Sequence, residues 1–367
     1  MRIDEIRLSN FRNYGSLKMR FDKRINVLIG DNAQGKTNLL EAISFLSTVR
    51  SFRIKDETDL IKKDCDIARI EGVITTVAGE KRLTVMIGQT GKSLLIHRNP
   101  VRRTSEFIGQ CNAVLFTPAD MDFFEAPPKV RRRMMDVELS KLSPVYMENL
   151  NQYVKVLKER NLYMKQERPD IEYLEVLSDR LIALQIPIIE SRREFLDFIA
   201  KRISSLFCKF MDDDFEVNIQ YASESDSHTD LANQIRLKMS ASLKRDLALK
   251  LTHVGIHRDD ANFTLNGFDV SSFASQGQKR MLILALKMAI LEFIVSKINT
   301  YPILLLDDVF SELDTKKKDK FTQLLPKDVQ ILITTTDISD INGWPASETE
   351  VFIVRNGAVA PFKEDYR

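Results

Sequence analysis

Three groups of residues in this chain have types and spacings suited to phosphate chemistry. The first is a glycine-rich stretch that ends in a lysine and a threonine: Gly30, Asp31, Asn32, Ala33, Gln34, Gly35, Lys36 and Thr37. It matches G-x-x-x-x-G-K-[ST], in which glycines let backbone N–H groups turn toward a phosphate, the lysine reaches the β- and γ-phosphates, and the hydroxyl binds Mg²⁺. An apolar run at residues 25–29 precedes it, and apolar residues at helical spacing follow, at Leu39, Leu40, Ile43 and Leu46. This strand-loop-helix context is the one that the motif requires, so the sequence predicts a nucleotide site.

A pair of carboxylates forms the second group. Asp307 and Asp308 end an apolar run at residues 302–306, which is typical of a strand covered on both faces of a parallel sheet. Such sheets bind ligands at the carboxyl ends of their strands. We therefore expect Asp307 to share Mg²⁺ with Thr37, and Asp308 to orient or deprotonate a water molecule. The alternative is a strand that ends in two solvated acids.

The third group begins a long apolar helix that we expect to run to about residue 298. Its residues are Ser275, Gln276, Gly277 and Gln278. Ser275 and Gln278 have the S-x-x-Q spacing of a capping box, which is the structural interpretation. The functional interpretation is that the free N–H groups of this helix start, with Gly277 allowing close approach, bind the γ-phosphate of a nucleotide held by another subunit. The two interpretations are compatible.

Composition limits the remaining possibilities. The chain has 367 residues, with 54 basic against 52 acidic side chains, so it is not a uniformly basic nucleic-acid binder. Any DNA surface must be a local patch, although each basic run taken singly is more often a solvated face. The candidates are residues 102–103, 131–133, 192–193 and 316–318. Three widely spaced cysteines indicate neither zinc nor a disulfide framework, and no apolar run reaches 18 residues. We expect a cytoplasmic protein with no membrane contact.

The order of elements predicts an α/β fold with two lobes. Residues 1–122 and 296–367 would form an ATPase lobe that holds the P-loop and the Asp-Asp strand, and residues 123–295 a second lobe with a helical arm and the Ser-Gln-Gly-Gln motif. Residues 128–211 read as helices that form an antiparallel two-helix arm, or else a plain helical subdomain. The expected seam of the arm contains Leu150, Val154, Leu157, Met164, Leu174, Leu177, Leu181, Leu184 and Ile188.

The order of four motifs resembles that of ABC-type ATPase heads of the SMC and Rad50 group. These motifs are the P-loop, the Ser-Gln-Gly-Gln sequence, the acidic strand and the Ser-Glu-Leu-Asp sequence at residues 311–314. Further segments resemble the RecF family over most of the chain: residues 10–14, 30–38, 50–53, 116–118 with Asp120, 131–132 and 257–260. The resemblance implies a two-lobed, Rad50-like P-loop ATPase that binds ATP and Mg²⁺. It also implies that Arg12 and Asn38 lie at the nucleotide, and that Lys36 and Asp308 take part in hydrolysis.

The resemblance further implies how such a protein works. Two ATP molecules would be sandwiched in a homodimer, which binds duplex DNA and duplex–single-strand junctions at gaps, and weak DNA-stimulated hydrolysis would release it. It would act with RecR and RecO to load RecA.

Three alternatives stay open at this point. One is another SMC-like ATPase, such as an anti-phage head, which the absence of a nuclease domain disfavours. A second is an ABC subunit that energises transport or acts on ribosomes, which the inserted arm and the missing switch histidine near Thr335 and Thr336 disfavour. The third is a P-loop kinase, which the Ser-Gln-Gly-Gln motif and the Asp-Asp pair disfavour.

Overall fold

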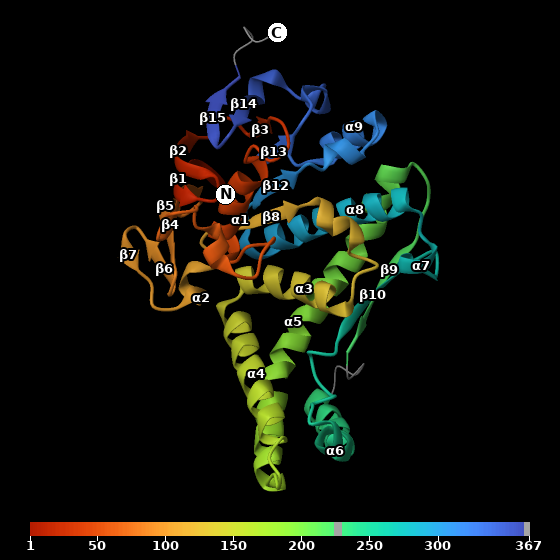
Figure 1. Ribbon diagram of the computed structural model, residues 1–367. Coiled ribbons are helices and arrows are strands. Elements are labelled where there is room, and N and C mark those ends of the chain that lie inside the picture. Colours follow the sequence, from red (N-terminus) through yellow and green to blue (C-terminus); the bar gives the residue numbers. More distant parts are fainter. Residues whose placement is uncertain (224–229, 363–367) are drawn as a thin grey trace. The chain divides into compact units, whose positions relative to one another are not determined.

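The computed structural model describes residues 1–223 and 230–362 (Figure 1). The chain divides into two compact units, one made of Met1–Met121 with Lys287–Arg367 and the other of Asp122–Leu286. The first unit is assembled from both ends of the chain, and the second is one continuous segment. The division at residues 122 and 295 into functional lobes stays a prediction.

An antiparallel sheet forms one side of the first unit. Its strands are β1 (Arg2–Phe11), β2 (Tyr14–Arg20), β4 (Ile67–Thr76), β5 (Gly79–Gly88), β6 (Gly91–Ile96) and β7 (Asn99–Pro100). Their spatial order is β2-β1-β4-β5-β6-β7. Alternating burial along β1 and β2 shows why these residues form strands, because one face of the sheet is apolar and covered.

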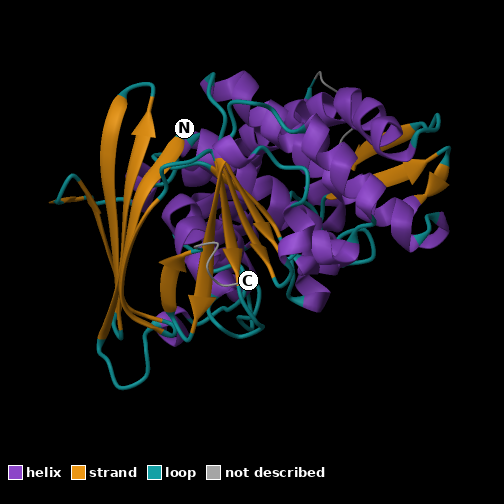
Figure 2. Cartoon of the chain, turned by 90° about the horizontal axis from the view of Figure 1, so that it is seen from above, coloured by secondary structure: helices purple, strands orange, loops and turns teal. Residues whose placement is uncertain are grey.

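A second sheet carries the phosphate motifs. Its strands are β3 (Ile25–Ile29), β8 (Ala113–Phe116), β12 (Ile303–Asp307), β13 (Ile331–Thr335), β14 (Thr349–Arg355) and β15 (Ala358–Pro361), in the order β15-β14-β3-β13-β12-β8. All neighbours are parallel except the final hairpin of β14 and β15. Only β13 separates β3 from β12, and the three strands are parallel, so the loop after β3 and the acids after β12 lie at the same edge of the sheet. Figure 2 shows the strands of the chain in orange and the helices in purple.

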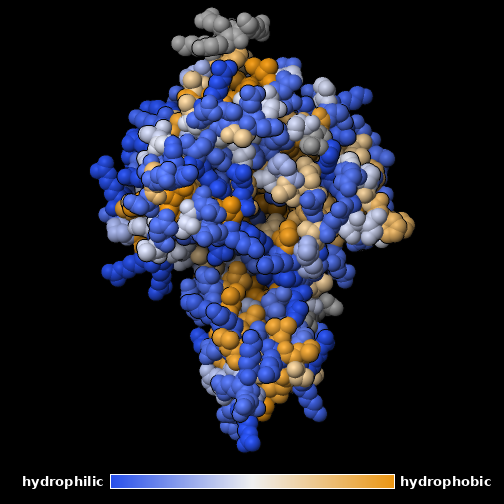
Figure 3. All heavy atoms as spheres, in the orientation of Figure 1, coloured by the Kyte–Doolittle hydropathy of each residue, from blue (hydrophilic) through white to orange (hydrophobic). Residues whose placement is uncertain are grey.

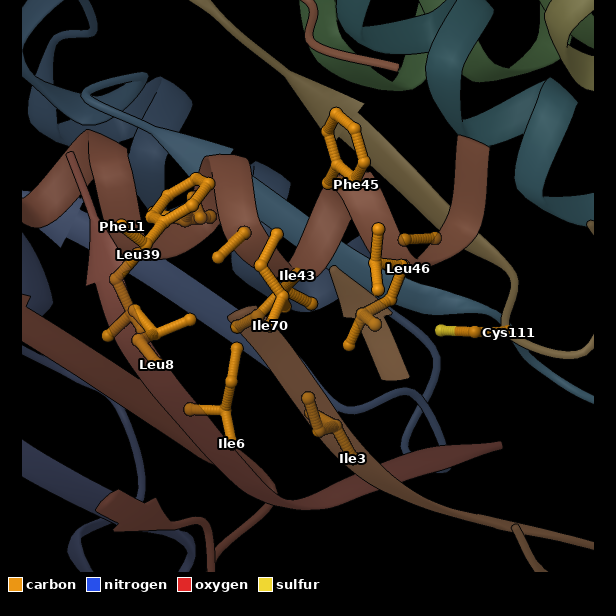
Figure 4. Close-up of a cluster of buried hydrophobic side chains, with 14 of the residues drawn as sticks. Ile3, Ile6, Leu8, Phe11, Leu39, Ile43, Phe45, Leu46, Ile70 and Cys111 are labelled. Carbon is orange, nitrogen blue, oxygen red and sulfur yellow. The ribbon is translucent and has the colours of Figure 1, made fainter. Parts of the chain in front are cut away.

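Helix α1 (Lys36–Thr48) lies over the antiparallel sheet and begins at the P-loop lysine. Its residues Leu39, Ile43 and Leu46 are fully buried and face apolar residues of β1 and β4, including Ile6 and Ile70 (Figure 4). This face is the one predicted from helical spacing. The core therefore fixes the helix that presents Lys36 and Thr37.

Shorter elements complete the first unit. They are α2 (Thr104–Phe107), α9 (Thr315–Leu324) and the 3₁₀ turns Glu57–Leu60, Pro118–Asp122, Phe310–Glu312, Ile338–Ile341 and Ala346–Glu348, the second of which ends one residue past the first unit.

The second unit is mainly helical. It contains α3 (Pro128–Leu142), α4 (Pro144–Tyr163), α5 (Ile171–Met211), α6 (Leu231–Leu249), α7 (Val270–Phe273) and a small sheet of β9 (Val217–Ala222), β10 (Asp260–Leu265) and β11 (Phe268–Asp269). Helix α8 (Gln276–Ile298) begins in this unit and ends in the other. Within the described part of the chain, no helix has both the length and the apolarity that crossing a membrane needs.

Helices α4 and α5 form the expected two-helix arm, but the seam expected on α4 is only partly right. Met164, just after α4, is buried and Leu150 and Leu157 are half-buried, whereas Val154 is exposed. The buried residues within α4 are Tyr146, Tyr153, Val156 and Arg160. The seam on α5 is largely as expected, since Leu174, Leu177, Leu181 and Ile188 are buried. Exposed apolar residues therefore remain on the arm, among them Val154, Leu162 and Val176 (Figure 3).

A buried ion pair explains why the α4 seam differs from the apolar pattern. The Arg160 guanidinium donates from Nη1 to Asp246 Oδ2 at 2.9 Å, and both side chains are at most 1% exposed. Arg160 also donates to Thr252 Oγ1 at 2.7 Å and to Ser178 Oγ at 3.1 Å, while Asp246 accepts the N–H of His253. A charged residue thus takes a core position because a carboxylate and two hydroxyl groups bond to it there.

This pair gives the first prediction. Arg160→Met leaves the Asp246 carboxylate buried without its cation, so it should lower the free energy of unfolding by about 3–5 kcal/mol. Urea denaturation followed by circular dichroism measures the change.

The matched control is the pair of Arg236 and Asp179, which is also 2.9 Å long but has side chains 51% and 60% exposed. Arg236→Met should cost about 0–1 kcal/mol. Equal losses in the two variants would contradict the prediction.

Candidate nucleotide-binding site

The P-loop has the backbone shape of an anion-binding turn. Ala33 and Gly35 have φ values of 64° and 119°, and Gly35 stands directly before the first residue of α1. Lys36 is buried, and its ammonium donates to the carbonyl of Gly30 and, at 2.8 Å, to that of Asp31. A lysine at the start of a helix, beneath a tight loop, presents a cation together with free N–H groups.

Thr37 and Asp307 meet although 270 positions separate them. The Thr37 hydroxyl donates to Asp307 Oδ1 at 2.8 Å. Thr334, in the strand between β3 and β12, donates its hydroxyl to the same oxygen at 2.8 Å and accepts the N–H of Asp308 at 3.0 Å. Thr37 and Asp307, which the sequence predicts to share Mg²⁺, are therefore in contact, and one buried threonine bonds to the Asp307 carboxylate and to the Asp308 backbone.

Asp308 has the surroundings of a reactive carboxylate. It follows β12 with a φ of 51°, and its Oδ1 is buried with no hydrogen-bond partner among the described residues. Burial, with a smaller contribution from the neighbouring Asp307 carboxylate, raises the pKa of Asp308. A higher pKa makes a carboxylate a stronger base, as proton abstraction from water requires.

Burial acts on the lysine in the opposite direction. It lowers the pKa of Lys36, and the carboxylates of Asp308, Asp307 and Asp31 partly offset this effect. The three carboxylates thus favour the charged form of Lys36 against the effect of burial.

Arg12 and Asn38 lie beside the P-loop but are already bonded. Arg12 donates from Nε and Nη2 to both oxygens of Glu41, a fully buried residue of α1, at 2.9 and 3.0 Å. Asn38 donates to Asn13 Oδ1 at 2.9 Å and accepts from Arg53 at 2.8 Å. In this structure both residues secure the start of α1, and their contact with a nucleotide stays a prediction.

The Ser-Gln-Gly-Gln motif forms its capping box in the second unit. Ser275 Oγ accepts the N–H of Gln278 at 3.2 Å, and Gln278 Oε1 accepts the N–H of Ser275 at 2.9 Å. Ser275 and Gln276 are exposed. A Cβ added at Gly277 would meet nothing within 4 Å, so packing within the chain does not require glycine there.

Two of the four basic runs that we expected as candidate DNA surfaces contain an arginine that is paired with carboxylates inside the chain. Arg131 forms a bidentate pair with Asp260, at 2.7 and 2.8 Å. Arg192 is 1% exposed and donates to Asp136 and Asp259 at 2.8 and 3.0 Å. Because these guanidiniums are paired inside the second unit, the runs at 131–133 and 192–193 are partly structural. Arg102 and Arg103 are exposed.

Sequence reasoning missed Thr334 and the contacts of Gln34. Thr334 lies in an apolar strand, where a threonine is an ordinary strand residue, so no local signal marked it. Gln34 accepts hydrogen bonds from Asn13 and from the turn between β14 and β15, segments far from it in the sequence.

The residues of the first unit fit a nucleoside triphosphate with a divalent cation. They offer the ammonium of Lys36, the hydroxyl of Thr37 and the carboxylate of Asp307. Asp308 adds a carboxylate oxygen that has no hydrogen-bond partner among the described residues. Such groups bind the phosphates and the cation of this kind of ligand. No cluster of three or more His, Cys, Asp or Glu side chains suited to a metal occurs in the described ranges. A cation here would therefore depend on phosphate oxygens and water as well as on protein, as Mg²⁺ commonly does.

Comparison with known proteins identifies the family. The model of the RecF/RecN/SMC N terminal domain matches residues 2–358. The "DNA replication and repair protein RecF" of Oceanobacillus iheyensis is 38% identical over 98% of this chain and 100% of its own length. The chain belongs to the RecF family. The RecF of Geobacillus thermodenitrificans is 36% identical over 98% of this chain and 99% of its own length.

Solved structures agree with this assignment. One described as "the recombination mediator protein RecF-ATP in RecFOR pathway" is 31% identical and has a TM-score of 0.90, covering 98% of this chain and 97% of its own. The Smc head domain of Pyrococcus furiosus has a TM-score of 0.58 at 16% identity, covering 99% of this chain and 96% of its own, and shows the fold alone. The expected α/β fold of an ABC-type, SMC-like ATPase head is confirmed, and RecF membership disfavours the transport, ribosome, anti-phage and kinase alternatives.

Thr334 yields the second prediction. Thr334→Val keeps the shape but removes the hydroxyl that holds Asp307 and Asp308, so we expect ATP affinity in the presence of Mg²⁺ to fall about tenfold. Titration with a fluorescent ATP analogue, with and without Mg²⁺, measures the effect, which should be larger with the cation present.

Thr335→Val is the matched control, because Thr335 is equally buried in the same strand and its hydroxyl bonds to Asp340 instead. Both variants should lose stability, but only the first should lose affinity. Thr334→Ser should restore it, and equal affinities in the two valine variants would contradict the role of Thr334.

Proposed function

We propose that this RecF-family chain is an ATP-dependent DNA-binding protein of recombinational repair and replication maintenance. ATP binding drives dimerisation and binding to duplex DNA and to duplex–single-strand junctions at gaps, and weak DNA-stimulated hydrolysis releases the DNA. The observation that carries the proposal is the 2.8 Å bond between Thr37 and Asp307, which joins the P-loop to the acidic strand. It occurs in a chain that matches RecF-ATP along 98% of its length.

Each residue of the first unit has a part in this proposal. Lys36 and the backbone of residues 30–35 bind the phosphates, and Thr37 with Asp307 holds Mg²⁺. Mg²⁺ would neutralise charge on the β- and γ-phosphate oxygens. Asp308 orients the attacking water and accepts its proton, for which the unpartnered Oδ1 and the raised pKa are suited. Arg12 and Asn38 hold the loop and the edge of the nucleotide site.

The Ser-Gln-Gly-Gln motif contributes to the site of a second copy. Its helix start is exposed, and Gly277 has open space where a side chain would stand, which supports close approach of a phosphate from outside the chain. Ser275, Gln276, Gly277 and Gln278 would bind the γ-phosphate across a two-fold axis, so that two ATP molecules join two chains. Hydrolysis removes that bridge and opens the dimer.

DNA is the proposed macromolecular ligand, and a basic patch in the first unit is the best candidate surface. Arg102 and Arg103 are adjacent and exposed, unlike Arg131 and Arg192. Contacts from such residues to phosphates position a protein on duplex without reading its sequence. RecR is the direct protein partner in this proposal, with RecO and RecA acting downstream. Work on DNA also favours the cytoplasm as the location.

The third prediction separates nucleotide binding from dimerisation. Lys36→Met should abolish ATP binding, because the loop loses its cation. Ser275→Arg should leave ATP binding intact but prevent dimerisation, since a bulky cation at the helix start blocks the partner's phosphate. Fluorescent nucleotide titration and sedimentation with ATP measure the two effects, and a Ser275→Arg variant that still dimerises with ATP would show that the sandwich is wrong.

The fourth prediction concerns DNA. Binding to a gapped duplex should require ATP and weaken with salt, because each phosphate contact releases counterions. Arg102→Ser/Arg103→Ser should reduce the slope of log affinity against log salt by about two, roughly one for each lost contact. Fluorescence anisotropy across a salt series measures the slope.

Arg236→Ser, which removes an exposed cation from α6, is the control and should leave the slope unchanged. Failure of the wild-type chain to bind at low salt with ATP and Mg²⁺ would leave an ATPase head and contradict the repair function.

A further inference from the structure

The turn between β14 and β15 is hydrogen-bonded to the P-loop. Strands β14 and β15 are joined by Asn356 and Gly357, whose φ values are 48° and 74°. The N–H of Asn356 donates to the side-chain oxygen of Gln34 at 2.7 Å, and the N–H of Gly357 donates to the Gln34 carbonyl at 3.0 Å. Two adjacent N–H groups of the hairpin thus bond to one residue at the centre of the phosphate motif, more than 300 positions earlier.

A second turn meets the same residue. Asn13, between β1 and β2, donates from Nδ2 to the Gln34 carbonyl at 2.9 Å, so this oxygen accepts two hydrogen bonds. The neighbouring Tyr14 hydroxyl donates to the Gly35 carbonyl at 3.0 Å and is buried. Carbonyls of two successive P-loop residues are therefore engaged from outside the loop.

These bonds set the direction of the peptide between Gln34 and Gly35. In a trans peptide the C=O and the following N–H point in opposite directions. With the Gln34 carbonyl held by the hairpin and by Asn13, the N–H of Gly35 must point away from them. Successive N–H groups turned to one side are the feature that makes such a loop bind anions.

The hairpin approaches too closely for side chains. A Cβ added at Gly357 would lie 2.8 Å from the carbonyl oxygen of Asn13, and one added at Gly30 would lie 2.3 Å from that of Val354 in β14. Backbone therefore packs on backbone at both places, and the loop has little room to relax its shape. A residue at position 357 also needs a φ that L side chains adopt rarely.

We propose that the turn Asn356–Gly357, together with Asn13, is a positioning element for the nucleotide. It holds Gln34 so that the P-loop keeps its phosphate-binding conformation, although the turn itself touches no phosphate. The inference rests on the proposed ATP function of the loop and adds residues from the C-terminal end of the chain to it. Disturbing the turn should therefore raise the KM for ATP and leave kcat at saturating ATP nearly unchanged.

Gly357→Val tests this directly. It should weaken binding of a fluorescent ATP analogue about tenfold or more, because a small displacement of a positioning group is costly. Gly79→Val is the matched control, since Gly79 also has a positive φ, 108°, in a hairpin of the same unit, but a Cβ there meets nothing within 4 Å. Its affinity should stay within about twofold of wild type. Thermal unfolding without nucleotide reports the stability that each variant loses.

Asn13→Ala provides a second variant, which removes the Nδ2 donor to the Gln34 carbonyl and leaves both the hairpin and the P-loop sequence intact. It should also weaken ATP binding with kcat retained, and it decides the matter if Gly357→Val does not fold. If the folded variants bind ATP as tightly as wild type, this inference is wrong but the proposed function stands. A wild-type chain that binds no ATP would overturn the proposed function and this inference with it.

Discussion

The hydrogen bond between Thr37 and Asp307 depends on how the strands of the first unit are arranged. A hydroxyl at the start of α1 reaches a carboxylate at the end of β12 only if β3 and β12 belong to one parallel sheet with their carboxyl ends at the same edge. Strand β13 lies between them and supplies Thr334, whose hydroxyl bridges the Asp307 carboxylate and the backbone N–H of Asp308. The apolar residues of α1 then anchor the helix on the antiparallel sheet. The packing of the first unit thus brings together the side chains of Thr37, Asp307 and Thr334, which belong to distant parts of the chain.

The second unit depends on charge inside its core. Arg160 and Arg192 are among its most buried side chains, and each is bonded to carboxylates. Asp259 and Asp260 belong to the His-Arg-Asp-Asp segment that pointed to the RecF family. Here Asp259 accepts from Arg192 and Tyr221, and Asp260 pairs with Arg131. The segment joins α3, α5 and β9 to the start of β10, which leads through β11 and α7 to the exposed Ser-Gln-Gly-Gln helix start.

Local patterns predicted much of this structure. The glycine motif, the apolar runs before it and before the acids, and the S-x-x-Q capping box specify conformations over a few residues, and all are formed in the structure. The seam of α4 was only partly right, because counting apolar residues cannot identify an arginine that is buried with its partner from another helix. The same limit applies to the basic runs, because the sequence of an Arg-Arg pair does not show whether its side chains are exposed to solvent or buried in a core. Thr334 and the contacts of Gln34 depend on which strands become neighbours, and that information is spread over the whole chain.

The position of β3 has a consequence for biosynthesis. This strand is hydrogen-bonded on its two sides to β13 and β14, which are made about 300 residues later. At ribosomal rates of about 5–20 residues per second, β3 waits on the order of 15–60 s for both neighbours. The continuous segment Asp122–Leu286, whose strands β9, β10 and β11 pair with one another, is made during that interval. Until β13 and β14 have been made, the nascent chain therefore carries an apolar strand with two open edges, and this is the stage at which aggregation or the help of a chaperone matters most.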